Sequence, residues 1–334
     1  YTDHESEGIY KYSLSTEGNL KKIGLVATIE NPSFLALSTN KKYVLSVNEV
    51  AEENGGSVSS FEIKGDSLRF INKAASGGNN PCYVSIAENG NVLVANYSSG
   101  TVGLLNLDKK GYLTELLATQ QHTGKGTTER QEGPHAHSVW LDKNNQNKII
   151  AVDLGTNELW FSEINTTNNN FLPTTQKLAM ATGAGPRHLA FHPKDNSIYV
   201  LNELNNTITL VKNNNGIYEK LSTISTIPAD FSDFSKAADI HVSDDGKFVY
   251  ASNRGHDSIA IFSINNDGSL TLVDFENTKI KTPRNFSLSP DNMFLLVANK
   301  DANTITAFSR DTATGKLNLV SEIDAPTPVC ILFE

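Results

Sequence analysis

The chain has 334 residues, of which 38% are hydrophobic and 19% are charged, which is typical of a globular protein with one large domain or two ordinary ones. Its formal net charge is −9, and this argues against nucleic acid as a partner because phosphate binding needs a basic surface. No apolar run approaches the ~20 residues that span a bilayer, and the distant Cys82 and Cys330 form neither a disulfide framework nor a Cys-x-x-Cys metal motif.

Short apolar runs with alternating character follow one another along the whole chain. They are rich in Val, Ile, Phe, Tyr and Thr and are separated by Gly, Asn and Asp, so each run predicts a β-strand between two turns. No segment of ten or more residues has a convincing helical pattern, and residues 230–239 are the nearest candidate for a short helical turn. The clearest strands are expected at residues 43–48, 58–63, 92–97, 101–107, 198–203, 207–212, 248–253, 258–264, 294–299 and 304–310.

The strands recur in a fixed order that starts at a proline. A strand of about six residues follows the proline, then a turn, a strand that ends in Asn or Asp, and two further strands. The repeat starts about every 45 to 53 residues, which predicts an all-β, seven-bladed β-propeller with four-stranded blades rather than a two-sheet sandwich or a helical solenoid. The anchors are Pro32, Pro81, Pro134, Pro186, Ala237, Pro283 and Pro328, and the second strands end at Asn48, Asn96, Asp153, Asn202, Asn253 and Asn299.

The two ends of the chain are expected to share the last blade. Residues 327–334 resemble an innermost strand, whereas residues 8–14 and 20–28 resemble the third and fourth strands of a repeat. Pairing them closes the ring, so we expect residues 1–334 to form a single domain in which this blade has three strands.

Two positions of each repeat are predicted to lie at one mouth of the central channel. One directly follows the anchor and the other directly follows the terminal Asn or Asp of the second strand, and adjacent antiparallel strands bring these positions together. Ionisable residues collect there: His135, Arg187 and Arg284 at the first position and Glu203, Arg254 and Lys300 at the second, with His137 on the same strand face as His135. The alternative to a site is a belt of Arg–Glu ion pairs that ties the blades together.

The remaining histidines show no paired arrangement in the sequence. His188 follows Arg187, so it should face the other way and pack in the core. The histidines near the predicted mouth have cationic neighbours that would repel a dication, so we expect no metal and no other cofactor. A G-x-S-x-G motif for a serine hydrolase is also missing.

Five segments resemble the seven-bladed lactonase family: "RQEGPHAHSVWLD", "GAGPRHLAFHP", "YVLNELNNTI", "FVYASNRGHDSIAIF" and "TPRNFSLSPDNMFLLVAN". This family contains bacterial 6-phosphogluconolactonases of the propeller type and the fungal enzyme that forms a lactone from 3-carboxy-cis,cis-muconate. The resemblance runs from Gly8 to Phe333, but of a "YVGTYT"-like strand at the start of similar proteins only Tyr1 and Thr2 are present.

The resemblance implies lactone chemistry at His135 or His137, Arg187, Glu203 and Arg254. Glu203 would accept a proton from the attacking water, an arginine would stabilise the oxyanion, and a histidine would protonate the leaving ring oxygen. Arg130, Arg284 and Lys300 are the remaining cations expected to bind a substrate phosphate.

Three functions remain open at this point. The first is hydrolysis of 6-phosphogluconolactone, and the second is a lactonase or lactonising enzyme for another acid, such as a carboxylated muconate or an unphosphorylated sugar lactone. The third is a propeller that binds an anion or a protein partner without turnover. The expected partner is therefore a small anionic sugar lactone or related organic acid. The implied function favours the cytoplasm, although a chain that starts at Tyr1 is also what removal of a signal peptide leaves.

Overall fold

A computed structural model describes residues 1–2, 4–53, 55–174 and 176–334. The described elements are β-strands and one 3-10 helix, Glu129–Gln131. Residues 230–235 contain no helix, and strand β20 begins at Lys236, so the candidate helical turn at residues 230–239 is wrong. The all-β prediction is confirmed by this architecture.

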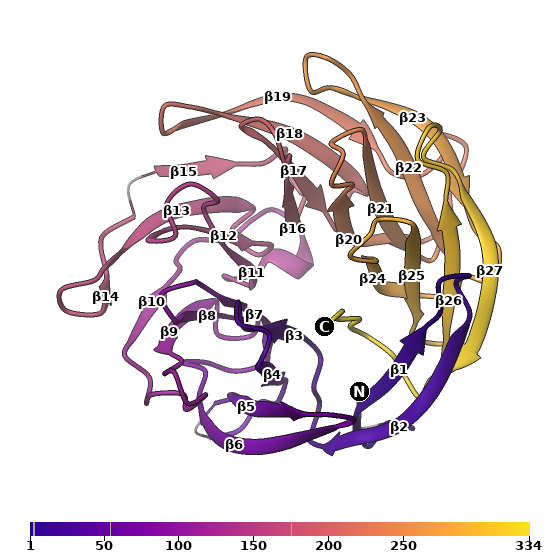
Figure 1. Cartoon of the computed structure of the whole chain (residues 1–334). Helices are drawn as coiled ribbons and strands as arrows, with labels where there is room; N and C mark the ends of the chain where they lie inside the picture. The colour runs from indigo at the N-terminus through magenta and orange to yellow at the C-terminus, as the bar shows by residue number, and fades with distance from the viewer. Residues whose placement is uncertain (3, 54, 175) are drawn as a thin grey trace. The chain divides into compact units, whose positions relative to one another are not determined.

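The strands form antiparallel sheets in which chain neighbours are also sheet neighbours (Figure 1). The first three sheets contain β3 (Leu35–Leu37), β4 (Tyr43–Asn48), β5 (Ser57–Lys64) and β6 (Ser67–Ala75); β7 (Pro81–Ile86), β8 (Asn91–Asn96), β9 (Thr101–Asn106) and β10 (Ala118–Gln121); and β11 (Ala136–Leu141), β12 (Lys148–Asp153), β13 (Glu158–Asn165), β14 (Asn170–Phe171) and β15 (Gln176–Ala179). Because β14 and β15 pair with opposite ends of β13, they are two pieces of one outer strand.

Three further sheets follow in the second half of the chain, and each has four strands. They contain β16 (Pro186–Phe191), β17 (Ser197–Asn202), β18 (Thr207–Asn214) and β19 (Ile217–Ser225); β20 (Lys236–Val242), β21 (Phe248–Arg254), β22 (Ser258–Ile264) and β23 (Leu270–Glu276); and β24 (Pro283–Leu288), β25 (Phe294–Asn299), β26 (Thr304–Arg310) and β27 (Leu317–Asp324). The four-stranded blades of a β-propeller are therefore present, as the sequence repeat predicts.

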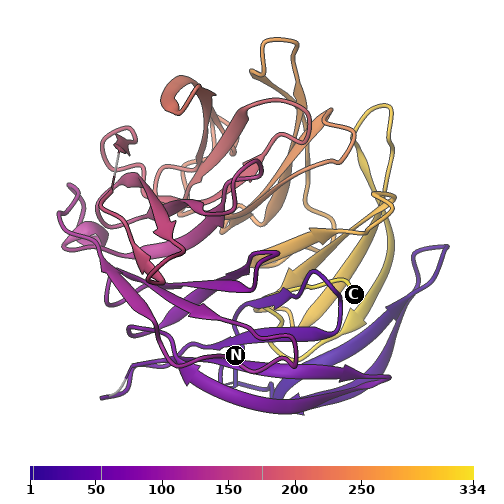
Figure 2. The same cartoon turned by 60° about the vertical axis from the view of Figure 1, so that its left-hand side comes forward.

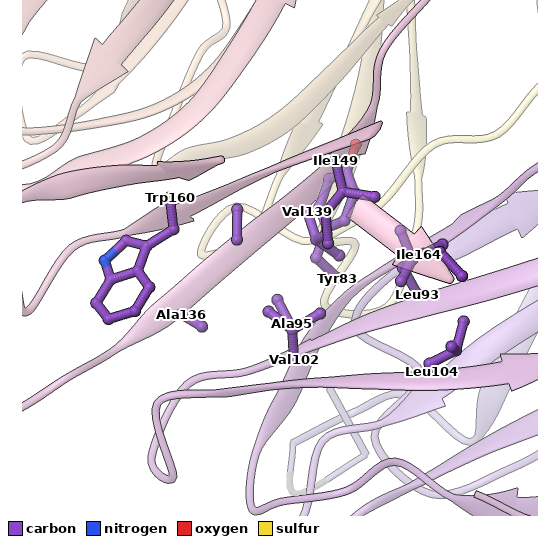
Figure 3. Close-up of a cluster of buried hydrophobic side chains, with 11 residues drawn as sticks. Tyr83, Leu93, Ala95, Val102, Leu104, Ala136, Val139, Ile149, Trp160 and Ile164 are labelled. Atoms are coloured by element: carbon purple, nitrogen blue, oxygen red, sulfur yellow. The ribbon is translucent and has the colours of Figure 1, made fainter. Parts of the chain in front are cut away.

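The chain divides into two compact units. The first contains residues 1–11, 23–185 and 334, and the second contains residues 12–22 and 186–333. In the first unit, neighbouring sheets pack face to face through apolar side chains, among them Tyr83, Leu93, Val139 and Trp160 (Figure 3). Burial of each such side chain contributes about 1.5–3 kcal/mol to folding.

The core of the second unit follows the same plan. Tyr199 and Leu201 of one sheet pack against Val249 and Phe262 of the next. Another cluster joins that sheet to β24–β27, whose strands run from orange to yellow in Figure 2. The first strands lie side by side in the order β16, β20, β24, so side chains at the same position of these strands come close together.

In two sheets of the second unit, the turn between the first and second strands owes its shape to a Ser-x-Asp pattern. The Ser243 hydroxyl donates to Asp245 and accepts from the backbone N–H of Phe248, while the Asp245 carboxylate accepts from the backbone N–H of Lys247. The turn at Ser289 repeats these bonds. Such local side-chain bonds stabilise a turn against continued strand, so this sequence pattern fixes where the first strand ends.

The repeated asparagine or aspartate near the end of each second strand is buried, and in four sheets it is an asparagine that ties the sheet to the preceding connection. In the fifth sheet, Asn253 donates to the carbonyl of Thr226, and the Thr226 hydroxyl donates back to the Asn253 side-chain oxygen, both at 2.7 Å. Asn48, Asn96 and Asn299 likewise donate to carbonyls of the segments before their sheets. The repeated asparagine in the sequence therefore has a structural role.

A β-bulge interrupts the first strand of five sheets at its start. The register shifts between Pro81 and Tyr83, Pro186 and His188, and Pro283 and Asn285, and equivalent shifts occur in β11 and β20. A proline has no N–H to donate to the ladder, which favours such an irregularity at its position. The residue after the anchor is the extra residue of the bulge.

This register corrects one anchor of the repeat. Ala136 pairs with Asp153 in the way that Pro186 pairs with Asn202, so Ala136 and not Pro134 is the anchor of the third sheet. His137 is consequently the residue equivalent to Arg187. The sequence alignment missed this because it followed the nearest proline.

The chain ends depart from the expected three-stranded blade. Strands β1 (Gly8–Leu14) and β2 (Leu20–Thr28) form a two-stranded sheet, and residues 327–334 contain no strand. The innermost strand expected at residues 327–334 is therefore not present. Ile331 and Phe333 still pack on the cluster that contains Phe294 and Leu296.

Candidate functional site

The strongest cluster of charged side chains lies in the second unit, at the ends of β16, β17 and β21. Arg187 is the bulge residue of β16, Glu203 directly follows β17, and Arg254 is the last residue of β21. The Nε atom of Arg187 and the Nη2 atom of Arg254 each lie 3.0 Å from Oε2 of Glu203. The structure thus brings together three of the predicted residues, with two arginines on the carboxylate of Glu203.

This cluster is held by the start of β20 and is nearly closed to solvent. Arg187 donates through Nη1 to the carbonyl of Ala238, and Arg254 donates through Nη2 to the carbonyl of Ala237 at 2.9 Å. The side chains of Arg187 and Glu203 are 3% and 4% exposed, whereas that of Arg254 is 17% exposed. Arg254 is therefore the member of the cluster that a solute reaches most easily.

Positive charge exceeds negative charge around Arg187. Burial, and then the charges of Arg254 and Arg284, lower the pKa of Arg187 from 12.5 to about 10, and Glu203 and Asp239 oppose this shift. The guanidinium remains charged at neutral pH. Three arginines near two carboxylates make this region of the second unit attractive to an anion.

His188 is buried, as expected, but it does not face away from Arg187. Its Nδ1 atom lies 2.8 Å from Oδ1 of Asp239, and its Nε2 atom lies 3.2 Å from Nη1 of Arg187. The bulge between Pro186 and His188 breaks the strict alternation of strand side chains, which explains the error. Burial, and then the charge of Arg187, lower the pKa of His188 from 6.5 to about 4.

Asp239 is the residue of this cluster that sequence reasoning missed. It is buried in the bulge of β20 and accepts hydrogen bonds from side chains of its own strand and of the two neighbouring first strands, β16 and β24. Burial acts to raise the pKa of Asp239, but the charge of His241 and hydrogen bonds from His188 and His241 lower it well below its usual range. An acid inside the apolar run "AADIHV" was the available signal.

The predicted histidines lie in the first unit around Tyr97. The ring of His135 stacks on Tyr97 at 4.4 Å, and His137 meets the same ring edge-on at 5.6 Å. Arg130 donates to the Tyr97 hydroxyl at 2.7 Å, and Nε2 of His135 lies 3.3 Å from an oxygen of Glu132. Tyr97 was not among the predicted residues, although it directly follows Asn96 and so occupies one of the two recurring mouth positions.

The other predicted cations lie in the second unit. Arg284 is the bulge residue of β24, and Lys300 directly follows β25 and pairs with Asp301 at 3.2 Å. Some histidines that seemed unpaired in the sequence do have acidic partners: His241 with Asp239, and His192 with Asp195.

In the first unit, His122 lies 2.7 Å from Asp153. Both side chains are fully buried, and His122 stacks on Trp160 at 4.1 Å. His122 thus also has an acidic partner that its place in the sequence does not indicate.

Within the described ranges, no group of three or more His, Cys, Asp or Glu side chains is placed to bind a metal ion. Among the same residues, no helix is long and apolar enough to span a bilayer. The chemistry available in the second unit is that of fixed guanidinium donors beside a carboxylate. Such a set can accept a proton from water and stabilise an oxyanion.

Comparison with known proteins gives a consistent result over the whole chain. Residues 1–333 match the family described as lactonase, 7-bladed beta-propeller. The chain is 39% identical over 341 residues to the 6-phosphogluconolactonase of Bacillus subtilis, covering 100% of this chain and 96% of the relative. It is 35% identical over 334 residues to the 6-phosphogluconolactonase of Formosa agariphila, covering 95% and 92% of the two chains.

A solved structure extends the comparison to an enzyme with a different name. The periplasmic gluconolactonase of Pseudomonas aeruginosa superposes with a TM-score of 0.92 at 26% identity, covering 98% of this chain and 95% of that one.

Proposed function

The chain belongs to the lactonase family of seven-bladed β-propellers and is a lactone hydrolase, and we propose that its substrate is 6-phospho-D-glucono-1,5-lactone, which it opens to 6-phosphogluconate. The observation that carries this proposal is the buried Arg187–Glu203–Arg254 cluster, in which two guanidiniums hold one carboxylate oxygen. The full-length relative named 6-phosphogluconolactonase supports the choice of substrate.

The proposed reaction uses the cluster for its two charged steps. Water attacks the lactone carbonyl, its proton passes to Glu203, and the negative charge that develops on the carbonyl oxygen is stabilised by Arg254 or Arg187. The ring C–O bond then breaks, and the leaving oxygen takes a proton to become a hydroxyl group. The product is a single molecule that carries the new carboxylate and the new hydroxyl group, so no cofactor is needed.

The proton for the leaving oxygen is assigned to His135 or His137 on the family resemblance alone. Histidine is the side chain that most often performs such a proton transfer. Arg130 likewise stays a prediction as a substrate-binding residue. These three residues belong to the first unit, and the geometry that supports the proposal concerns the second.

A phosphate on the substrate is supported by the excess of positive charge. Arg254 and Arg284 both lower the pKa of Arg187, so their charges act on one region. We assign Arg284 and Lys300 to the phosphate. Arginine offers it two parallel hydrogen bonds, and lysine binds it as a point charge. The Pseudomonas aeruginosa gluconolactonase favours an unphosphorylated sugar lactone as the second candidate substrate.

The seventh blade is also part of the proposal, in line with the family's description. We propose that residues 1–334 form one seven-bladed domain and that β1, β2 and the C-terminal segment make up the last blade. The support is local to the second unit, where Tyr12, Leu14, Leu20, Ile331 and Phe333 share one apolar cluster.

The test is hydrolysis of 6-phosphogluconolactone beside gluconolactone, each corrected for spontaneous opening. We expect kcat/KM to be higher for the phosphorylated lactone. Arg284→Ala should lower it by about tenfold to a hundredfold, because a hydrogen bond to a charged group contributes about 1.5–3 kcal/mol. The same change should hardly affect gluconolactone.

Arg69→Ala is the matched control, since Arg69 is exposed and pairs only with Glu62 among the ion pairs of the described chain. Equal losses for both lactones in Arg284→Ala would remove the phosphate assignment. Turnover of neither lactone by the unmodified protein would overturn the proposed function and favour a purely structural network of ion pairs.

A further inference from the structure

The carboxylate of Asp239 is a buried hydrogen-bond acceptor with donors on both oxygens. Its Oδ1 atom accepts from His188 at 2.8 Å and from the backbone N–H of Ile240 at 3.0 Å. Its Oδ2 atom accepts from His241 at 3.2 Å and from Asn285 at 2.5 Å. Donors on both oxygens leave the carboxylate one orientation, so its position is fixed with respect to β16 and β24.

The contacts of His188 determine where its proton lies. Arginine has only donors, so Nε2 of His188, 3.2 Å from Nη1 of Arg187, must be an acceptor. The proton of the neutral ring is therefore on Nδ1, where it is donated to Asp239. A carboxylate that accepts from Nδ1 stabilises this tautomer, and the tautomer in turn presents a lone pair to Arg187.

Arg187 is directed by three acceptors of the protein. They are Oε2 of Glu203, the carbonyl of Ala238 and Nε2 of His188. Asp239 supports two of them, because it follows Ala238 in the same bulge and orients the ring of His188. Loss of the Asp239 carboxylate would therefore weaken the two contacts that hold the Arg187 guanidinium at His188 and Ala238.

We propose that Asp239 is a positioning residue that acts through His188 to orient the guanidinium of Arg187 for lactone hydrolysis. This rests on the proposed function, since it assigns Arg187 a direct part in the reaction. Asn285 extends the arrangement: it donates to Asp239 and accepts the backbone N–H of Ile331 at 2.7 Å, so the C-terminal segment braces the same carboxylate.

The test compares Asp239→Asn, His188→Gln and the double variant. An asparagine amide facing Nδ1 would favour the other tautomer of His188, which points an N–H at Arg187 instead of a lone pair. A displaced catalytic group can cost about 100-fold in rate, so we expect kcat for 6-phosphogluconolactone to fall by about that factor in each single variant. KM should change less than about threefold, since an oriented oxyanion donor acts mainly in the transition state.

The double variant shows whether Asp239 acts on Arg187 through His188 or independently of it. We expect its kcat to match that of either single variant, because residues in one network are not additive. His192→Gln is the control: His192 lies in the turn after β16, where it pairs with Asp195, and its replacement should leave kcat unaffected. Losses that multiply in the double variant would overturn the route through His188.

A second readout does not depend on turnover. The side-chain Nε–H resonance of Arg187, identified by its loss in Arg187→Lys, should shift in Asp239→Asn and stay in place in His192→Gln. If no lactone is hydrolysed, the proposed function fails while this shift still tests the positioning. An unchanged resonance and wild-type kcat in Asp239→Asn would overturn the inference, and if that variant does not fold, wild-type kcat in His188→Gln overturns it.

Discussion

Each unit of the molecule contains a buried Asp–His pair of nearly the same geometry. In the first unit, Nδ1 of His122 lies 2.7 Å from Asp153, and in the second, Nδ1 of His188 lies 2.8 Å from Asp239. The four side chains are at most 5% exposed, so burial does not distinguish the two pairs. They differ in what lies on the other side of the imidazole ring.

The ring of His122 stacks on Trp160, and among the described residues its Nε2 atom has no hydrogen-bond partner. The ring of His188 continues to Arg187 and from there to Glu203. The hydrogen bonds of the first pair therefore stop at His122, which packs on an aromatic ring. Those of the second pair continue through His188 to two further charged side chains. The neighbours of an Asp–His pair, rather than the pair itself, indicate whether it serves chemistry.

The position of Asp153 supports this difference. It ends β12, where other sheets have the buried asparagine that ties a second strand to the segment before it. Its Oδ1 atom accepts from the backbone N–H of His135 and its Oδ2 atom pairs with His122. The aspartate and histidine of the first unit thus replace the Asn253–Thr226 type of contact.

The largest effect is expected at Glu203, the last residue of the hydrogen-bonded series that starts at Asp239 and His188. Glu203→Gln keeps the size of the side chain and its capacity to hydrogen-bond but removes the proton acceptor, so kcat should fall by about 10²–10⁴-fold. Substrate binding should survive, as measured by product inhibition. Glu158→Gln, which alters a partly exposed carboxylate paired with Lys177, is the control. Full activity in Glu203→Gln would transfer the role of base to a histidine.

A second difference should appear in the pH dependence of stability. The pKa of His188 is about 4 in the folded protein and 6.5 in an unfolded chain, so the unfolded state binds more protons between these values. Folding stability should therefore rise from pH 4 to pH 6.5 and be lost as the pH falls. The contribution is on the order of 1–3 kcal/mol, since one pKa unit corresponds to about 1.4 kcal/mol.

Urea unfolding of the unmodified protein and of His188→Gln at pH 4.5 and pH 6.5 measures this contribution. The variant should lose part of the pH dependence, and the exposed His4→Gln should retain all of it. The same slope in all three proteins would mean that His188 is not held neutral by the fold.

The smallest effect is expected in the first pair. Asp153→Asn installs the residue type of the other sheets and keeps an oxygen for the backbone N–H of His135. We expect kcat to change less than about threefold and the free energy of unfolding to fall by about 1 kcal/mol. The kcat of this variant can be compared directly with that of Asp239→Asn, because both change the aspartate of a buried Asp–His pair to asparagine. A loss of kcat as large as that of Asp239→Asn would remove the distinction between the two pairs.

Much of this arrangement follows from the sequence. The period of the strands and the repeated asparagine predict the sheets, and the two mouth positions identify Arg187, Glu203 and Arg254 before any coordinates. Strand alternation fails where the bulges occur, because a bulge adds a residue that alternation does not count. That is why His188 was assigned to the wrong face and His135 to the position that His137 holds.

The parts that could not be predicted depend on contacts between neighbouring strands. Asp239 becomes significant only because β16 and β24 lie on either side of β20 and supply His188 and Asn285. The C-terminal segment reads as a strand by composition, yet a strand forms only with a ladder partner. The composition of a segment does not show which strands will lie beside it.

The measurement that tests the central claim most directly is a crystal structure of the protein with 6-phosphogluconate, the product that it cannot hydrolyse further. The account predicts that the product carboxylate lies against Arg254 and the Arg187–Glu203 pair, with the phosphate on Arg284. Product bound at any other place, with Glu203 remote from its carboxylate, would contradict the assignment of this cluster as the active site.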